Sequence, residues 1–120
     1  FALVVYITHT NHPPIFTSEP VTHATQTVPY TYHITAYDPD GDTLAITAPT
    51  IPAWLILTDH GDGSATLTGT PDETQMGYYS IELLVTDSFG LTEPQSFKIK
   101  VSSNQNFYSY LFSLFFHQAP

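Results

Sequence analysis

The clearest chemistry in this chain lies in five consecutive residues, Asp-Pro-Asp-Gly-Asp at positions 38–42, which carry the carboxylates of Asp38, Asp40 and Asp42. The run follows an alternating, strand-like stretch at 30–37, and its proline and glycine predict a turn. Three carboxylates in one turn repel each other unless a cation lies among them, and Ca²⁺ takes roughly 6–8 oxygen ligands. The run therefore predicts a calcium site in a turn at the end of a β-strand.

The same run also fits a plain solvated turn, in which Asp38 accepts hydrogen bonds from backbone amides. It is not an EF-hand, which needs Gly at the sixth loop position and Glu at the twelfth. Here Gly41 is fourth and Pro49 is twelfth. A second acidic pair, Asp59 and Asp62, lies in a hairpin signal; it could bind another cation, although a solvated turn is the favoured interpretation.

The segments around these turns have the pattern of short strands. Between 30 and 37, Tyr32, Ile34 and Ala36 share the inward parity, and Thr31 and His33 face water. Similar stretches recur along the chain, and Trp54 is expected in the core. About seven short strands at regular spacing predict an all-β sandwich. The main stretches are 15–17, 30–37, 44–47, 53–57, 65–69, 79–85 and 97–101.

Sandwich topology brings further oxygen donors to the acidic turn. The strand 79–85 runs in the same direction as 30–37, so Asp87 is expected at the same end of the molecule. The first strand runs the opposite way, so the linker at Asn11 enters there too. The candidate metal ligands are therefore Asn11, Asp38, Asp40, Asp42 and Asp87.

Composition excludes several classes of partner. The formal charge is −9, and Lys98 and Lys100 are the only basic residues apart from histidine, so binding to nucleic acid or to an anionic membrane is not expected. Cysteine is absent, which excludes disulfides and thiolate metal sites. No apolar run is long enough for a transmembrane helix, and the six histidines are scattered without the convergence that a zinc site needs.

The two ends of the chain suggest three parts: a strand and linker at 1–10, a sandwich at 11–102, and an aromatic-rich tail at 103–120. The pattern Phe1-x-Leu3-x-Val5 is repeated 96 residues later, in the stretch 97–101. Residues 1–7 could thus be the last strand of a preceding repeat in a tandem array, or the two strands could match by chance. The tail could begin another repeat, cover the sandwich, or pair with another chain as an added strand.

The ordered motifs resemble the dystroglycan-type cadherin-like domain, an immunoglobulin-like repeat of surface proteins. The matching residues cover about 11–101 and begin with Asn11-x-Pro13-Pro14. The resemblance implies a seven-stranded immunoglobulin/cadherin-like Greek-key β-sandwich in an extracellular or cell-surface protein, with calcium binding common in the family. The other matches are 32–44 (through Asp-Pro-Asp-Gly-Asp), Pro52-Ala53-Trp54-Leu55, Leu67-Thr68-Gly69-Thr70-Pro71, Gly77-x-Tyr79, Val85-Thr86-Asp87 and 97–101.

We therefore expect a non-catalytic calcium-binding module that acts in adhesion or as a stiff spacer between neighbouring repeats or other surface proteins. No nucleophile elbow, phosphate loop or His-Glu-x-x-His motif supports an enzyme. One alternative is a carbohydrate-binding accessory module that stacks exposed aromatic rings on a polysaccharide. Another is a filament or pilus-like subunit that self-assembles through its terminal strands. The rings considered for stacking are Tyr6, Tyr30, Tyr37, Tyr78 and Phe89.

Overall fold

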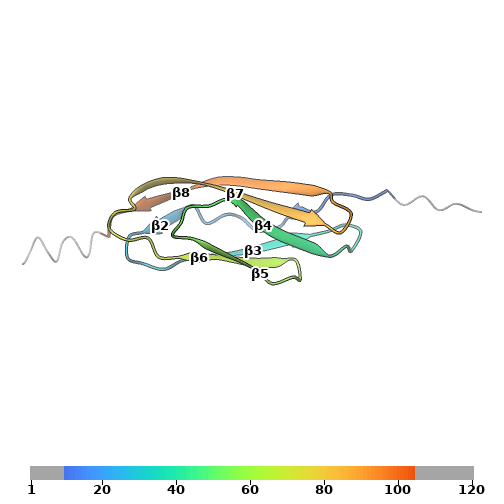
Figure 1. The fold of residues 1–120 in the computed structure, drawn as a ribbon, viewed down its shortest axis with the longest axis horizontal. Coiled ribbons are helices and arrows are strands. Elements are labelled where there is room, and N and C mark those ends of the chain that lie inside the picture. The colour runs from blue at the N-terminus through green and yellow to red at the C-terminus, as the bar shows by residue number, and fades with distance from the viewer. Residues whose placement is uncertain (1–9, 105–120) are drawn as a thin grey trace, which may run out of the picture.

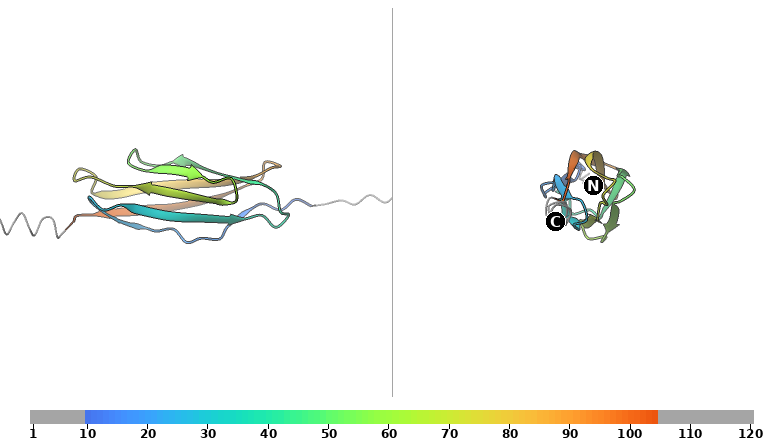
Figure 2. Two further views of the ribbon diagram at one scale, coloured as in Figure 1. Left: turned by 90° about the horizontal axis from the view of Figure 1, so that it is seen from below. Right: turned by 90° about the vertical axis from the view of Figure 1, so that its left-hand side faces the viewer.

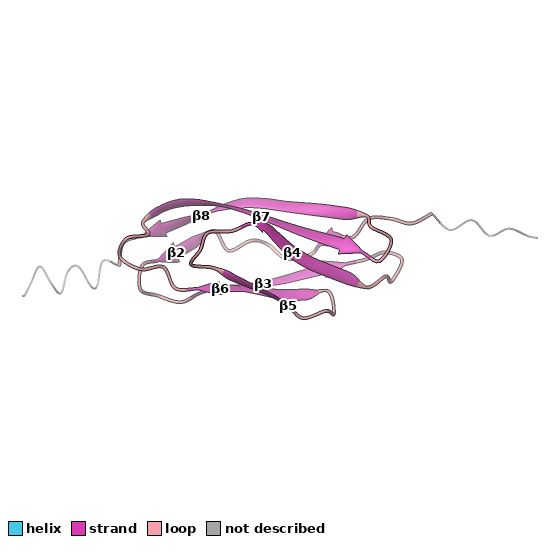
Figure 3. Ribbon diagram, in the orientation of Figure 1, coloured by secondary structure: helices cyan, strands magenta, loops and turns pink. Residues whose placement is uncertain are grey.

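This computed structural model describes residues 10–104 (Figure 1; Figure 3). Apolar and polar residues alternate along this range and many are β-branched or aromatic, so its regular elements are β-strands. Within that range no helix is long and apolar enough to cross a membrane. The strands are β1 (Ile15–Phe16), β2 (His23–Thr25), β3 (Tyr30–Tyr37), β4 (Leu44–Thr50), β5 (Ile56–Asp59), β6 (Ser64–Gly69), β7 (Gly77–Asp87) and β8 (Thr92–Ser102).

The strands form two four-stranded sheets that pack as the layers of a sandwich (Figure 2). One sheet has the order β1-β3-β6-β5 and the other β2-β8-β7-β4. Every neighbouring pair is antiparallel except β2 and β8, which are parallel. The all-β sandwich prediction is confirmed, with eight strands in place of seven. The extra strand arises because the chain crosses between sheets after Phe16, so the N-terminal segment contributes a short strand to each.

The core lies between the two sheets, where the inward parity of the long strands predicts it. In β3, Tyr32 and Ile34 are buried, while Thr31 and His33 on the other face are exposed. In β8, Ile99 is buried and its flanking lysines are exposed. The alternation predicted from sequence is therefore confirmed in both sheets. The most deeply buried apolar side chains are Tyr32, Ile34, Ile46, Leu67, Ile81, Leu83, Val85, Ile99 and Val101.

Trp54 packs against this core from the turn between β4 and β5, not from a strand as the segment 53–57 had predicted. β5 begins only at Ile56, because a turn closed by the amide of Leu55 and the carbonyl of Pro52 (3.1 Å) comes first. The indole meets the rings of Tyr30 and Tyr79 edge-on, with centroids 6.1 and 5.6 Å away. Three aromatic rings thus join the two sheets at this level of the sandwich.

Residues 10 and 104 lie at opposite ends of the long axis of the sandwich (Figure 1). The end at residue 10 also holds the turn between β3 and β4, the β5–β6 loop and the β7–β8 turn. Strand pairing explains this grouping. Leu44 at the start of β4 pairs with Asp87 at the end of β7, and the amide of Ala36 near the end of β3 donates to the carbonyl of Gly63 in the β5–β6 loop (2.8 Å). We call the group formed by Asn11, residues 38–42 and Asp87 the acidic pole.

Candidate metal centre

The β3–β4 turn wraps around the carboxylate of Asp38. Its Oδ1 accepts the backbone amides of Asp40 (2.8 Å) and Asp42 (3.3 Å), and its carbonyl accepts the amide of Gly41 (3.1 Å). Gly41 has a φ of +74°, a conformation that glycine adopts without strain. The turn predicted from Pro39 and Gly41 is thus present, and its hydrogen bonds hold the aspartates close to one another.

Asp38, Asp40 and Asp42 can each offer one oxygen such that all three oxygens lie within 4.8 Å of one another. Asp38 is buried, with 5% of its surface exposed, and the other two are half-buried. Carboxylates this close together, with little water around them, repel one another and raise the free energy of the folded protein. A cation among them would reverse that interaction.

At the acidic pole, Oδ2 of Asp38 and Oδ1 of Asn11 are buried and accept no hydrogen bond within residues 10–104. Leaving a buried oxygen without a partner costs about 1–3 kcal/mol, and more when the group is charged. Both are hard oxygen atoms of the type that Ca²⁺ takes as ligands. The plain-turn interpretation accounts for Oδ1 of Asp38 but gives Oδ2 no partner.

Asp87 is joined to Asn11 rather than to the three clustered aspartates. Its Oδ2 accepts Nδ2 of Asn11 at 2.8 Å, and its Oδ1 accepts the amides of Phe89 and Leu91, both at 2.9 Å. Since Asp87 pairs in register with Leu44, this second group lies next to the end of the acidic turn. The structure therefore places all five predicted residues at one end of the sandwich, in two adjoining groups.

His12 also contacts this pole, and sequence reasoning missed it because the histidines were considered only as zinc ligands, for which they are too scattered. Its amide donates to Oδ2 of Asp40 at 2.6 Å, and its Nδ1 lies 3.1 Å from Oδ1 of the same carboxylate. The available signal was its position directly after Asn11, in a linker already expected to enter here. Asn11 and His12 together attach the incoming segment to both groups of carboxylates.

The hairpin pair has a simpler structural role. Oδ1 of Asp59 accepts the amide of Gly61 (3.1 Å), and Oδ2 accepts the amide of Ile46 (3.2 Å). Oδ1 of Asp62 accepts the amide (3.0 Å) and hydroxyl (2.5 Å) of Ser64, and these bonds lower the pKa of Asp62. Both carboxylates cap backbone amides, which favours the turn interpretation for this pair.

Space for an ion and its waters exists beside the acidic turn. A hollow of about 310 Å³ lies between that turn and the β5–β6 loop, and its walls include Asp38, Asp42 and Asp62. A cation held by the turn would therefore remain accessible from solvent.

Acid should weaken the fold through Asp87. Burial alone would raise the pKa of this carboxyl, but the hydrogen bonds from Asn11, Leu91 and Phe89 together lower it below its usual value. A lowered pKa in the folded state stabilises the fold above the unfolded pKa of about 3.9. That contribution is lost as the pH falls through the folded pKa.

We expect Asn11→Ala to reduce this acid sensitivity, because it removes the largest cause that lowers the pKa of Asp87. The measurement is the melting temperature of both chains in metal-free buffer from neutral pH to about pH 3. Acidification should lower the melting temperature of the unchanged chain by more than it lowers that of Asn11→Ala. Equal losses would show that the Asn11 contact does not hold this pKa down.

Solved structures of known proteins share this fold. The endo-fucoidan hydrolase MfFcnA4 from glycoside hydrolase family 107 is 30% identical, with a TM-score of 0.65, and the match covers 76% of this chain and 14% of that one. The SrpA adhesin from Streptococcus sanguinis is 15% identical, with a TM-score of 0.69 and coverage of 86% and 63%. The sialic acid binding region of the Streptococcus sanguinis SK1 adhesin, bound to 3'sLn, is 19% identical, with a TM-score of 0.57 and coverage of 82% and 31%.

This chain thus spans less than two thirds of each of these proteins, and about a seventh of the hydrolase. A comparison with curated proteins finds no match. A family match covers most of the sandwich, residues 13–102, and the family is described as "Putative Ig domain". Because that match takes in three quarters of the sequence and the two-sheet architecture agrees with it, this chain belongs to that family of immunoglobulin-like domains.

Proposed function

We propose that this domain binds calcium at the acidic pole and acts as a non-catalytic, cadherin-like module of an extracellular or cell-surface protein. The observation that carries the proposal is Oδ2 of Asp38, a buried carboxylate oxygen that accepts no hydrogen bond within residues 10–104 and belongs to a cluster of three carboxylates. A bound cation would both satisfy that oxygen and neutralise its neighbours.

The size of the cluster and its three carboxylates suit calcium. Ca²⁺–oxygen distances of about 2.3–2.6 Å allow ligands on opposite sides of the ion to lie about 5 Å apart. Oxygens within 4.8 Å of one another meet that condition. Mg²⁺ usually keeps several waters and binds through one or two carboxylates, so three clustered carboxylates favour calcium.

The proposed ligands are Asp38, Asp40 and Asp42 with Oδ1 of Asn11, and Asp87 holds the Asn11 amide in place. Because Nδ2 of Asn11 donates to Asp87, Oδ1 is the atom through which Asn11 can bind a cation. Asp87 could also approach the ion as a direct ligand. Backbone carbonyls and water would complete the shell.

Calcium at this pole would stiffen the junction with whatever precedes the domain. Asn11 and His12 belong to the incoming segment and already contact both groups of carboxylates. An ion bound by the same groups would fix the direction in which that segment leaves the sandwich. A stiffened junction suits a spacer or adhesion module in a tandem array, as the cadherin-like resemblance implies.

The similar structures support an extracellular, accessory role. Two are parts of adhesins, and in the hydrolase the match covers 14% of a much longer chain. Such a place in a larger protein is typical of a module that spaces or positions other domains. The filament alternative depends on residues 1–7 and 105–120, which lie outside the described residues.

The carbohydrate alternative loses its aromatic platform. Tyr30 is buried, with 4% of its surface exposed, because it shares the inward parity of β3. Tyr37, Tyr78 and Phe89 are exposed but lie on different elements: β3, β7 and the β7–β8 turn. Tyr6 lies outside the described residues. Because β3 and β7 belong to different sheets, Tyr37 and Tyr78 do not share the single stacking face that this version of sugar binding requires.

Calorimetry with calcium on metal-stripped protein tests the proposal. The unchanged chain should bind at about 10⁻⁴–10⁻³ M, the range of extracellular modules. Asp38→Ala/Asp40→Ala should abolish the heat of binding. The matched control is Asp72→Ala/Glu73→Ala, which removes two exposed carboxylates from the β6–β7 turn and should bind normally. No heat from the unchanged chain at millimolar calcium, or equal loss in the control, would overturn the proposal.

A further inference from the structure

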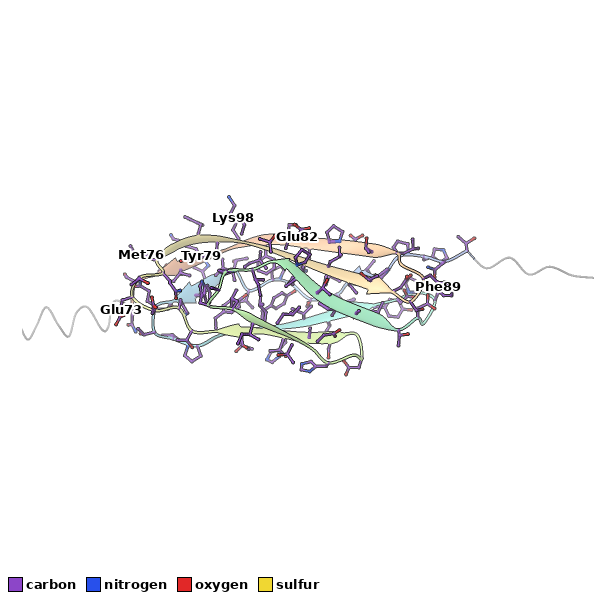
Figure 4. All side chains as sticks on the ribbon, viewed as in Figure 1. Glu73, Met76, Tyr79, Glu82, Phe89 and Lys98 are labelled. Atoms are coloured by element: carbon purple, nitrogen blue, oxygen red, sulfur yellow. The ribbon has the colours of Figure 1, made fainter. Side chains whose placement is uncertain are left out.

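The positive charge of this protein is confined to one face of one sheet. The chain has 11 acidic residues and two lysines, and both lysines are exposed side chains of β8. Figure 4 shows Lys98 pointing away from the body of the sandwich. Positions 98 and 100 share one parity, so the two ammonium groups lie on the same side of the sheet.

The outward residues of β7 complete this surface. Lys100 pairs in register with Tyr78, and Lys98 pairs with Ser80. The exposed fraction of Tyr78 is 68%, and the Nζ atom of Lys100 lies 5.9 Å from the centre of its ring. On the far side of β8, His23 of β2 pairs with Lys100. We call this surface the lysine face; its residues are Tyr78, Ser80, Glu82, Ser96, Lys98 and Lys100.

A shallow groove of about 390 Å³ lies beside Lys98. Its walls include the hydroxyl residues Thr50, Ser80 and Ser96, together with Glu82. Glu82 is the single carboxylate among the outward residues of β7 and β8, since Glu93 has the inward parity and is half-buried. The groove thus offers hydrogen-bonding hydroxyls next to the lysines.

We propose that the lysine face binds an anionic polysaccharide, a sugar chain that carries sulfate or carboxylate groups. The two lysines, whose backbone positions are about 7 Å apart along the strand, would bind two acidic substituents of one chain through their ammonium groups. The exposed ring of Tyr78 would lie against a sugar ring, and the groove hydroxyls would bind sugar hydroxyls. Elsewhere the chain is strongly acidic, so an anionic ligand would be repelled from other surfaces and directed here.

Other anionic partners fit this face less well. Nucleic acids are bound through many phosphate contacts, and membranes by clusters of about 4–8 basic residues. Two lysines supply neither in a chain of formal charge −9. A polysaccharide with spaced charges needs few cations and gains the rest of its contacts from hydroxyls and a ring.

The proposal is tested by measuring binding to immobilised dextran, dextran sulfate and carboxymethyl dextran. These three polymers share one sugar backbone and differ only in their charged substituents. All measurements are made with chelator present, so the outcome does not depend on the calcium site. The unchanged chain should bind one or both charged dextrans and not neutral dextran, and the preferred one identifies the acidic group. Lys98→Gln/Lys100→Gln should weaken binding about tenfold or more, because charge-assisted contacts are lost. Tyr78→Ala should weaken binding too, and Glu82→Gln should strengthen it.

Two controls separate a local site from general repulsion. Thr31→Glu/His33→Glu lowers the formal charge by the same two units, on exposed positions of the other sheet, and should bind normally. Tyr37→Ala removes an exposed ring from that same sheet and should also bind normally. No binding to either charged dextran, equal binding to neutral dextran, or equal weakening in the Thr31/His33 control would overturn the proposal. None of these results bears on calcium binding.

Discussion

Asp38→Asn should abolish the rise in melting temperature that calcium gives the unchanged chain. The amide oxygen of asparagine can still accept the backbone amides of Asp40 and Asp42, so the turn is preserved while its buried charge is removed. Calcium at about 100 times its dissociation constant should stabilise the unchanged chain by about 2.7 kcal/mol. For a domain of this size that is a shift on the order of 10 °C.

The same substitution should have the opposite effect without calcium. In chelator, Asp38→Asn should melt at or above the temperature of the unchanged chain, because repulsion among the three carboxylates is relieved. Asp72→Asn serves as the control. Oδ1 of Asp72 accepts the backbone amide of Thr74 (2.8 Å) in the same way, but Asp72 lies away from the acidic pole. A variant at Asp38 that keeps the full calcium shift would contradict the proposed site.

Much of the fold is visible in the sequence because periodicity of two is a strong constraint. The stretch 30–37 predicts β3 with its bounds and both of its faces. Pro39 and Gly41 predict the turn that ends it, and antiparallel topology brings Asn11 and Asp87 to the same end. These predictions rest on local chemistry and chain direction, which packing does not alter.

Other features depend on tertiary packing and have a weaker local signal. The change of sheet between β1 and β2 occurs in a polar segment without clear alternation. Trp54 reaches the core from a turn, where strand periodicity does not apply. The burial of Tyr30 was predictable, because it shares parity with Tyr32 and Ile34, and placing it among exposed rings was wrong.

At the acidic pole, sequence could name the oxygen donors but not how they are used. Spacing does not reveal that Asn11 donates its amide nitrogen to Asp87, nor that its oxygen accepts no hydrogen bond from any residue between 10 and 104. It also does not reveal that one oxygen of Asp38 caps the turn while the other accepts no hydrogen bond within residues 10–104. The distinction between a plain turn and a cation site lies in those individual atoms.

Gly69→Ala should destabilise the sandwich strongly, although alanine ordinarily suits a strand better than glycine. A Cβ added at Gly69 would lie 2.0 Å from the carbonyl oxygen of Trp54 and 3.0 Å from its carbonyl carbon. Both are backbone atoms, so the β4–β5 turn itself would have to move. That movement would disturb the edge-on contacts of Trp54 with Tyr30 and Tyr79.

The expected cost is about 1–3 kcal/mol or more, the usual range for overpacking a filled site. Unfolding in urea followed by tryptophan fluorescence measures it directly, since Trp54 is the one tryptophan of the chain. The native emission of the variant should also shift, because the indole sits on the displaced turn.

Gly61→Ala is the matched control: at a φ of +77° with no atom within 4 Å, it incurs backbone strain of about 1–2 kcal/mol without crowding. Gly61→Ala should leave the tryptophan emission unchanged. If Gly69→Ala is as stable as the unchanged chain, the β4–β5 turn can move without cost and the prediction is wrong.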